Sequence, residues 1–115
     1  MPNQESDAFD TDFTRRRVFQ EFDQAVREAN RAAIAATIGP VTKDHVLRVA
    51  VVVSKLRARY LREVLKLAGE GGERAMDPTA IVDMRQLREA YEEAMSGFGA
   101  LRHALERGYY DLSKG

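Results

Sequence analysis

The sequence contains no cysteine and no tryptophan, only three prolines, and no excess of either charge. Without cysteine the chain forms no disulfide, offers no thiolate to a metal ion and has no thiol nucleophile. The 18 basic and 18 acidic side chains cancel, so no overall field draws the protein to nucleic acid or to an anionic membrane. The longest apolar run, Val49 to Val53, is five residues, whereas a membrane-spanning helix needs about 20.

What is present is the composition of an ordinary folded domain in a chain of 115 residues, with 44% apolar and 31% charged residues. A chain of this size buries roughly two thirds of the surface that it exposes when unfolded, so we expect one core. The polar, acidic segment 1–7 has neither a basic start nor an apolar stretch. We therefore expect a cytoplasmic protein.

The N-terminal region divides into an acidic segment and a helix. Residues 1–13 carry four acidic and no basic side chains, which predicts a flexible acidic arm. From about Thr14 to Ile38, apolar residues repeat every three or four positions, and Gly39-Pro40 ends the helix. We call this apolar face the N-terminal seam; it consists of Phe19, Phe22, Val26, Ala29, Ala33 and Ala36.

The segment from Thr42 to Ala68 is expected to form a second helix with two apolar faces. The first seam is Val46, Val49, Val53, Leu56, Tyr60, Val64 and Leu67, and the second seam is Leu47, Ala50, Ser54, Ala58, Leu61, Leu65 and Ala68. At about 100° per residue their centres lie about 120° apart, so this helix is expected to contact two partners. The valines also favour a strand over 46–53, but the first seam continues too far for a strand.

A third helix is expected to begin at Asp77-Pro78 and to end at Gly108. Its apolar face, the C-terminal seam, consists of Met84, Leu87, Tyr91, Ala94, Phe98, Leu101 and Leu105. The seam keeps its register across Gly97 and Gly99, which favours a continuous or gently kinked helix over a break at Ser96. Residues 109–115 are expected to form a short C-terminal tail, whose aromatic residues Tyr109 and Tyr110 are candidates for docking on the helices.

Three long helices with short connections predict an all-α protein. We expect residues 14–108 to form an antiparallel up-down-up bundle with the second helix at its centre. Helices of about 25 to 30 residues are about 38–45 Å long, whereas a compact chain of this size has a radius of gyration of about 13 Å. Because so slender a bundle has little interior per helix, we also expect two chains to pair into a dimer.

No group of side chains predicts an active site, a metal site or a cofactor site. His103 and Glu106 lie one helical turn apart, but helical di-metal sites need two Glu-x-x-His pairs and two further glutamates. The glycine-rich segment 69–72 lacks the Lys-Ser/Thr of a phosphate-binding loop. The acidic group Glu89, Glu92 and Glu93 is expected on a solvated face. These patterns favour a protein that is not an enzyme.

Positive charge is concentrated in the second helix, where residues 42–68 carry a net charge of +5. Five of these side chains fall within about 40° of one line on the helix surface. This basic stripe is Arg48, Lys55, Arg59, Arg62 and Lys66, and a second basic cluster is Arg15, Arg16 and Arg17. The stripe has three interpretations: a solvated surface, a docking surface for an acidic protein or for the acidic arm, and a contact for nucleic-acid phosphates.

The sequence favours a small non-enzymatic protein that acts by helix-mediated association, as a homodimer or as an adaptor for another protein. The alternative is a nucleic-acid-binding accessory protein that uses the basic stripe and the second basic cluster. No aromatic residue interleaves the stripe for base stacking, and the helices are too long for a helix-turn-helix. Neither interpretation requires a cofactor.

Overall fold

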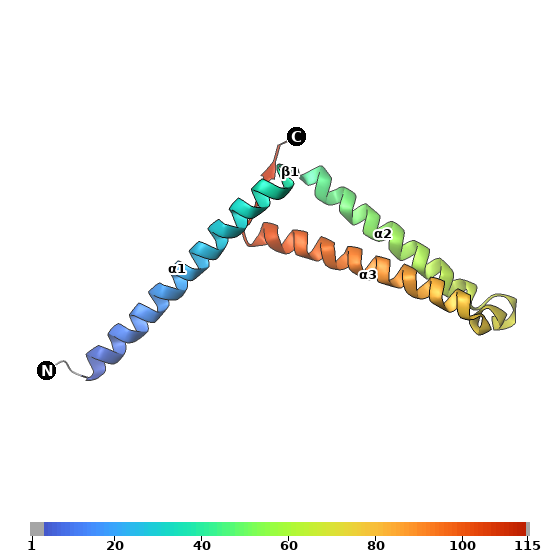
Figure 1. Cartoon of the computed structure of the whole chain (residues 1–115), viewed down its shortest axis with the longest axis horizontal. Helices are drawn as coiled ribbons and strands as arrows, with labels where there is room; N and C mark the ends of the chain where they lie inside the picture. The colour runs from blue at the N-terminus through green and yellow to red at the C-terminus, as the bar shows by residue number, and fades with distance from the viewer. Residues whose placement is uncertain (1–3, 115) are drawn as a thin grey trace.

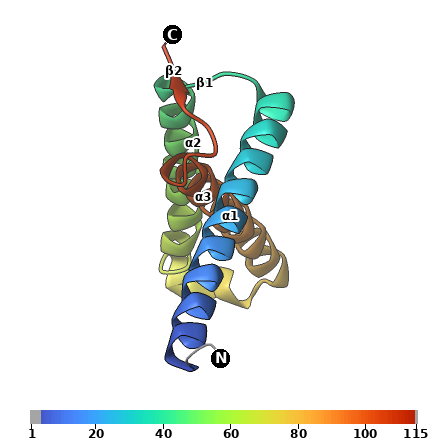
Figure 2. The same cartoon turned by 90° about the vertical axis from the view of Figure 1, so that its left-hand side faces the viewer.

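The computed structural model describes the backbone of residues 4–114, and the side chains of that range apart from residues 4–10, 70 and 74. The elements are α1 (Gln4–Ile38), β1 (Val41–Thr42), α2 (Lys43–Lys66), the 3-10 segment η1 (Glu70–Met76), α3 (Pro78–Glu106) and β2 (Leu112–Ser113). β1 and β2 pair in parallel, with Val41 opposite Leu112 (Figure 2). The predicted all-α class is therefore confirmed, since the strands are only two residues long.

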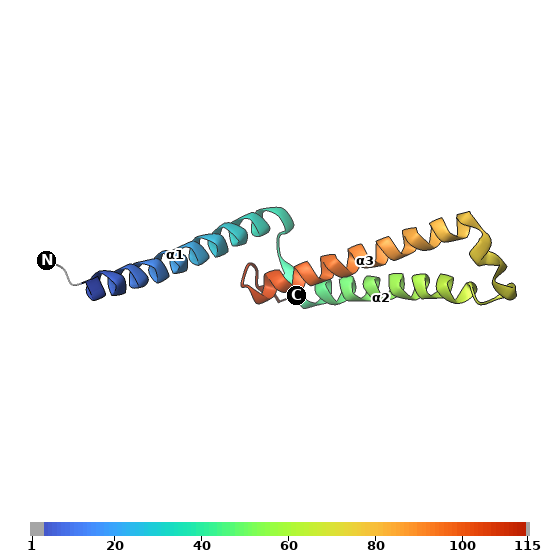
Figure 3. The same ribbon diagram turned by 90° about the horizontal axis from the view of Figure 1, so that it is seen from below.

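The molecule has two arms. α2 and α3 lie side by side and run in opposite directions as a hairpin, while α1 leaves the open end of this hairpin as a separate arm (Figures 1 and 3). The molecule measures 85 × 41 × 17 Å and its radius of gyration is 24.1 Å, far above the roughly 13 Å of a compact chain. The structure is thus extended, and the predicted up-down-up bundle of three helices does not form within one chain.

The central position predicted for the second helix was wrong, because α2 packs along α3 while α1 projects away as a separate arm (Figure 1). At the junction Gly39 takes φ +65°, a conformation that other residues rarely adopt, and Pro40 prevents the helix from continuing. The chain then enters β1, which is held by β2. The apolar repeats identify which face of a helix packs against another element, but they do not specify which element covers that face.

The hairpin core is made by the first seam of α2 and the C-terminal seam of α3. Every residue of both seams is at least half-buried, and Val53 is 5% exposed. Midway along the hairpin, the Tyr60 and Tyr91 rings stack at 6.5 Å with an angle of 12° between their planes. The Arg57 guanidinium lies 5.2 Å from the centre of the Tyr91 ring. One of the two seams predicted on α2 is therefore covered.

The observed helices agree with the predicted ones except at the start of α1. The strand alternative over 46–53 is wrong, and α3 is continuous through Gly97 and Gly99 as expected. Asp77 caps α3 by accepting a hydrogen bond from the Thr79 N–H at 2.9 Å. However, α1 begins at Gln4 rather than near Thr14. The described part of the predicted acidic arm is therefore helical, and its residues 1–3 lie outside the described range.

Candidate functional site

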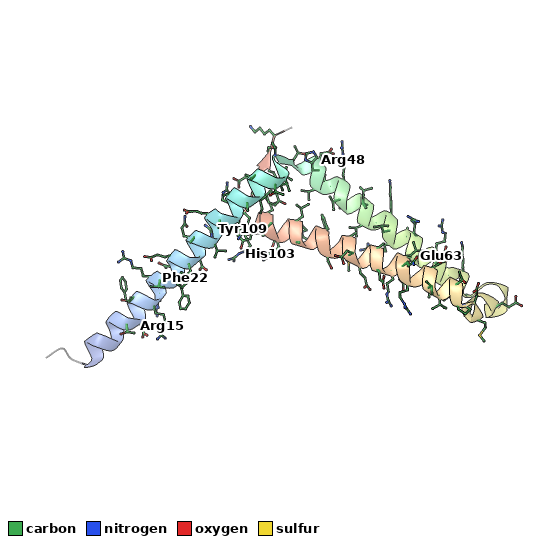
Figure 4. All side chains as sticks on the ribbon, in the orientation of Figure 1. Arg15, Phe22, Arg48, Glu63, His103 and Tyr109 are labelled. Carbon is green, nitrogen blue, oxygen red and sulfur yellow. The ribbon has the colours of Figure 1, made fainter. Side chains whose placement is uncertain are left out.

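The N-terminal seam lies open to solvent along the free arm. Its three large side chains, Phe19, Phe22 and Val26, are 58%, 57% and 51% exposed, and the alanines that continue the seam are exposed as well. The two phenyl rings contact each other edge to face at 6.1 Å. Figure 4 places Phe22 on the part of α1 that projects away from the hairpin. An apolar face of this length on a single helix normally packs against another helix.

The second seam of α2 is also largely uncovered. Leu47 and Leu61 are about half exposed, and Leu65 is 74% exposed. On α3, Met95 is also exposed, and its sulfur accepts a hydrogen bond from the Tyr91 hydroxyl at 3.3 Å. The hairpin thus presents a second apolar surface, separate from the face that closes its own core.

The chain as a whole exposes far more surface than its size requires. The accessible area is 9188 Å², whereas a compact monomer of this mass exposes about 6,300 Å². Across the described residues, only Val41, Val53, Ala80 and Tyr110 are buried. The excess of roughly 2,900 Å² is comparable with the surface that stable protein–protein interfaces cover.

The C-terminal tail fastens α1 to the end of the hairpin, in an arrangement that we call the C-terminal clasp. Arg31 Nη1 donates to the Gly108 carbonyl at 2.6 Å, and Arg31 Nη2 donates to Asp111 Oδ2 at 2.8 Å. The hydrogen bond from Arg31, followed by its charge, lowers the pKa of the Asp111 carboxyl. The same contact raises the pKa of Arg31. Both side chains are solvent-exposed, so water screens this ion pair.

The clasp also contains Tyr110, the most buried aromatic residue among those whose side chains the structure describes. The hydroxyl of Tyr110 donates to the Leu101 carbonyl at 2.7 Å, and burial raises the pKa of Tyr110. Ser113 donates from its hydroxyl to the Val41 carbonyl at 3.3 Å. An open hollow of about 590 Å³ lies between the tail and α1, with Ile34 and Tyr109 in its lining. The tail is therefore an ordered part of the fold.

Sequence reasoning missed this clasp. The tail was expected to dock through its aromatic residues, but nothing in the periodic pattern links Arg31 to residues near the C-terminus. Asp111 is the carboxylate partner of a cation 80 positions earlier. The pair Tyr109-Tyr110 was the one signal, since aromatic side chains bury a large apolar area, and the burial of Tyr110 agrees with the expected docking.

The basic stripe lies on an exposed face of α2. Its ion pairs are local: Arg48 contacts Asp44 at 2.7 Å, and Lys66 and Arg62 contact Glu63 at 3.1 and 3.9 Å. All five stripe side chains are exposed: Arg48, Lys55, Arg59, Arg62 and Lys66. Within the described residues, Lys55 and Arg59 have no ion-pair partner. The stripe and the second seam are different faces of one helix, since their centres lie about 110° apart.

The structure does not bring the two basic groups together. Arg15, Arg16 and Arg17 are exposed near the N-terminal end of α1, where Arg17 contacts Glu21 at 3.6 Å. Figure 4 shows Arg15 and Arg48 on different arms, far from each other. The N-terminal end of α1 also lies far from α2 (Figure 1), so the described part of the acidic segment, residues 4–13, does not cover the stripe.

The remaining polar candidates occupy separate positions. His103 and Glu106 are exposed at the end of α3, and Glu89, Glu92 and Glu93 are exposed along its outer face. His45 forms a capping box with Thr42, in which each side chain accepts a hydrogen bond at 3.1 Å from the other's backbone N–H. In the part of the chain that the structure describes, no three His, Cys, Asp or Glu side chains group as metal ligands would.

The function of this chain is inferred from its exposed surfaces, because comparison with known proteins gives no match. No protein-family model matches the chain, and neither the curated proteins nor the solved structures include one that matches it. Among the described residues, no helix combines the length and the apolar character needed to cross a membrane.

Proposed function

We propose that this protein acts by helix-mediated association, burying its exposed apolar seams against a second polypeptide. The observation that supports this most strongly is the N-terminal seam, because large apolar side chains lie exposed along a helix that its own chain leaves uncovered. Burying apolar surface contributes roughly 25 cal/mol per Å². The partner is a second copy of this chain, or another protein for which this one serves as an adaptor.

The size of the uncovered surface supports a stable complex. Standard protein–protein interfaces bury about 1,200–2,000 Å² in total, and obligate dimers bury about 2,000–5,000 Å². Two chains, each exposing roughly 2,900 Å² more than a compact monomer, have enough surplus surface for either class. Association would thus supply the interior that the single chain lacks.

The proposed role is non-enzymatic. The candidates for acid–base chemistry do not converge: the acidic group Glu89, Glu92 and Glu93 lies along α3, and His103 lies at the end of that helix. All four are exposed, whereas catalytic acids and bases usually lie in a cleft that shifts their pKa values. The proposal requires no cofactor.

Light scattering coupled to size-exclusion chromatography tests the association. At micromolar concentration we expect about twice the chain mass of 12.9 kDa, falling toward the single-chain value on dilution. A mass of one chain at every concentration, together with no complex in a pull-down from cell extract, would contradict the proposal.

The basic stripe supports a second candidate, which is binding to nucleic-acid phosphates. Its five cations lie on one exposed face, and Lys55 and Arg59 have no ion-pair partner within the described residues. If the stripe contacts phosphates, affinity for duplex DNA or RNA should fall steeply with salt, by about one log unit per log unit of salt for each phosphate contacted. Flat or absent binding at low salt would eliminate this candidate.

A further inference from the structure

We propose that the partner is a second copy of this chain and that two α1 arms pair antiparallel through their N-terminal seams. This inference rests on the proposed function, because it names the partner and the surface for the same association. It assigns the long free helix a defined role as a dimerisation arm.

The side chains of the N-terminal seam become smaller from one end to the other. The large residues Phe19, Phe22 and Val26 come first, and Ala29, Ala33 and Ala36 follow. An antiparallel pair centred midway between Val26 and Ala29 sets each large residue opposite an alanine of the other copy. Phe19 faces Ala36, Phe22 faces Ala33, and Val26 faces Ala29. Alternating large and small residues across an interface is the arrangement that lets side chains interdigitate without gaps or clashes.

A parallel pair lacks this complementarity. It would set phenylalanine against phenylalanine at one end and alanine against alanine at the other, so the two helices would be held apart at one end and poorly filled at the other. Ala25 and Ala32 flank the seam on one side, at about 70° and 90° from its centre. In the antiparallel pair these small residues face each other across the two copies, which permits close approach of the helices.

The clasp contacts α1 on the face opposite the N-terminal seam. Arg31, which holds the tail through Gly108 and Asp111, lies about 170° around the helix from the centre of the N-terminal seam. The hairpin therefore attaches to the face opposite the seam. Two α1 arms can pair while both clasps stay formed, so dimerisation requires no rearrangement of the chain.

The uncovered surface is large enough for a dimer interface. The seam from Phe19 to Ala36 spans about 25 Å along the helix at 1.5 Å per residue, and its members are all exposed. The pairing is isologous, since the same face is used by both copies, and twofold dimers are the commonest closed assemblies. The roughly 2,900 Å² of surplus surface per chain exceeds what each copy of a standard dimer contributes.

Cysteine cross-linking tests the proposal directly because the chain has no cysteine of its own. Two single variants, Phe22→Cys and Ala33→Cys, are purified separately, mixed and oxidised. The antiparallel pair brings these positions together, so the mixture should form a disulfide-linked dimer containing one chain of each kind. Neither variant alone should cross-link, because its two cysteines lie about 16 Å apart along the helix, beyond the roughly 7 Å Cα–Cα limit of a disulfide.

A second pair, Phe19→Cys with Ala36→Cys, retains Phe22 and guards against a loss of dimer caused by the first substitution. Leu61→Cys, on the second seam of α2, serves as the control, and mixed with Phe22→Cys it should not cross-link. Helix content of each variant is checked by circular dichroism before mixing.

The outcomes separate this proposal from the proposed function. Cross-linking of Ala33→Cys alone would show a parallel pair, and cross-linking of Phe22→Cys with Leu61→Cys would show α1 packed on the partner's hairpin. Either result overturns the antiparallel pairing and leaves association intact, as does a dimeric mass with no cross-link at either antiparallel pair. A single-chain mass would overturn the self-pairing, and it would overturn the proposed function as well only if the pull-down from cell extract also yields no complex.

Discussion

The hairpin and the α1 arm carry the same kind of apolar repeat but use it differently. In the hairpin, the first seam of α2 and the C-terminal seam of α3 cover each other, and Val53 is buried between them. On α1, a repeat with the same three- and four-residue spacing stays exposed from Phe19 to Ala36. The comparison teaches that such a repeat specifies a packing face, while the connection between helices decides whether the covering partner lies in the same chain.

The largest expected effect comes from placing a charge inside the hairpin. Val53→Asp puts a carboxylate where the valine is 5% exposed, and should lower the free energy of unfolding by about 3 kcal/mol. Val52→Asp is the matched control, because Val52 is 50% exposed in the same helix. Its effect should stay near 0.5 kcal/mol. Urea unfolding followed by circular dichroism measures both, and equal losses would contradict the assignment of the first seam as core.

The next effect should fall on association alone. Phe22→Asp puts a carboxylate into the proposed α1–α1 interface and should raise the dimer dissociation constant at least tenfold, a loss of about 1.4 kcal/mol or more. Gln20→Asp adds the same charge about 150° around the helix from the centre of the N-terminal seam. This variant should leave the dimer dissociation constant nearly unchanged. Analytical ultracentrifugation measures both variants. A dimer that tolerates Phe22→Asp would show that the N-terminal seam of α1 lies outside the dimer interface.

A smaller effect is expected from the glycines inside α3. A Cβ built at Gly97 meets nothing within 4 Å, so Gly97→Ala should stabilise the hairpin by about 1 kcal/mol through helix propensity. Gly108→Ala is the opposing control, because Gly108 has φ +75°, which costs other residues about 1 kcal/mol or more. Thermal unfolding compares them. A destabilising Gly97→Ala would show that another helix approaches α3 closely at this point.

The smallest effect concerns the direction of the α1 arm. Asp111→Asn removes the anion that pairs with Arg31, and should broaden the distance distribution between spin labels at Gln24→Cys and Lys55→Cys. Because the pKa of Asp111 is lowered in the folded chain, its stabilising contribution exists above its unfolded value of about 3.9 and is lost as pH falls below it. The distance distribution of the parent chain should therefore broaden as the pH falls from about 3.9 through the lowered pKa of Asp111.

Two comparisons make that experiment decisive. The Asp111→Asn variant should show the broad distribution already at neutral pH, with little further change on acidification. Asp23→Asn, which changes an exposed carboxylate of α1 outside the clasp, should behave as the parent chain does. An arm that keeps its orientation without Asp111 would mean that the β1–β2 pair and Tyr110 suffice to hold it.

Most of the secondary structure could be predicted because its signals are local. Asp77-Pro78 marks the start of α3, and the C-terminal seam runs in register through Gly97. The start of α1 was predicted ten residues too late, because an acidic segment with two phenylalanines resembles a solvated arm. The exposed basic stripe follows from its angle to the first seam, but the contact between Arg31 and Asp111 joins residues far apart in sequence and has no local signal.

The amino-acid sequence by itself determined three helices, their apolar faces and a cationic face on α2, because spacing and capping act over a few residues. Only the tertiary structure decided which faces are covered. Gly39, β1 and the clasp direct α1 away from the hairpin, so one apolar face closes a core and another remains open. The physical reason is that burial is favourable with any partner of matching shape, and chain geometry selects among them.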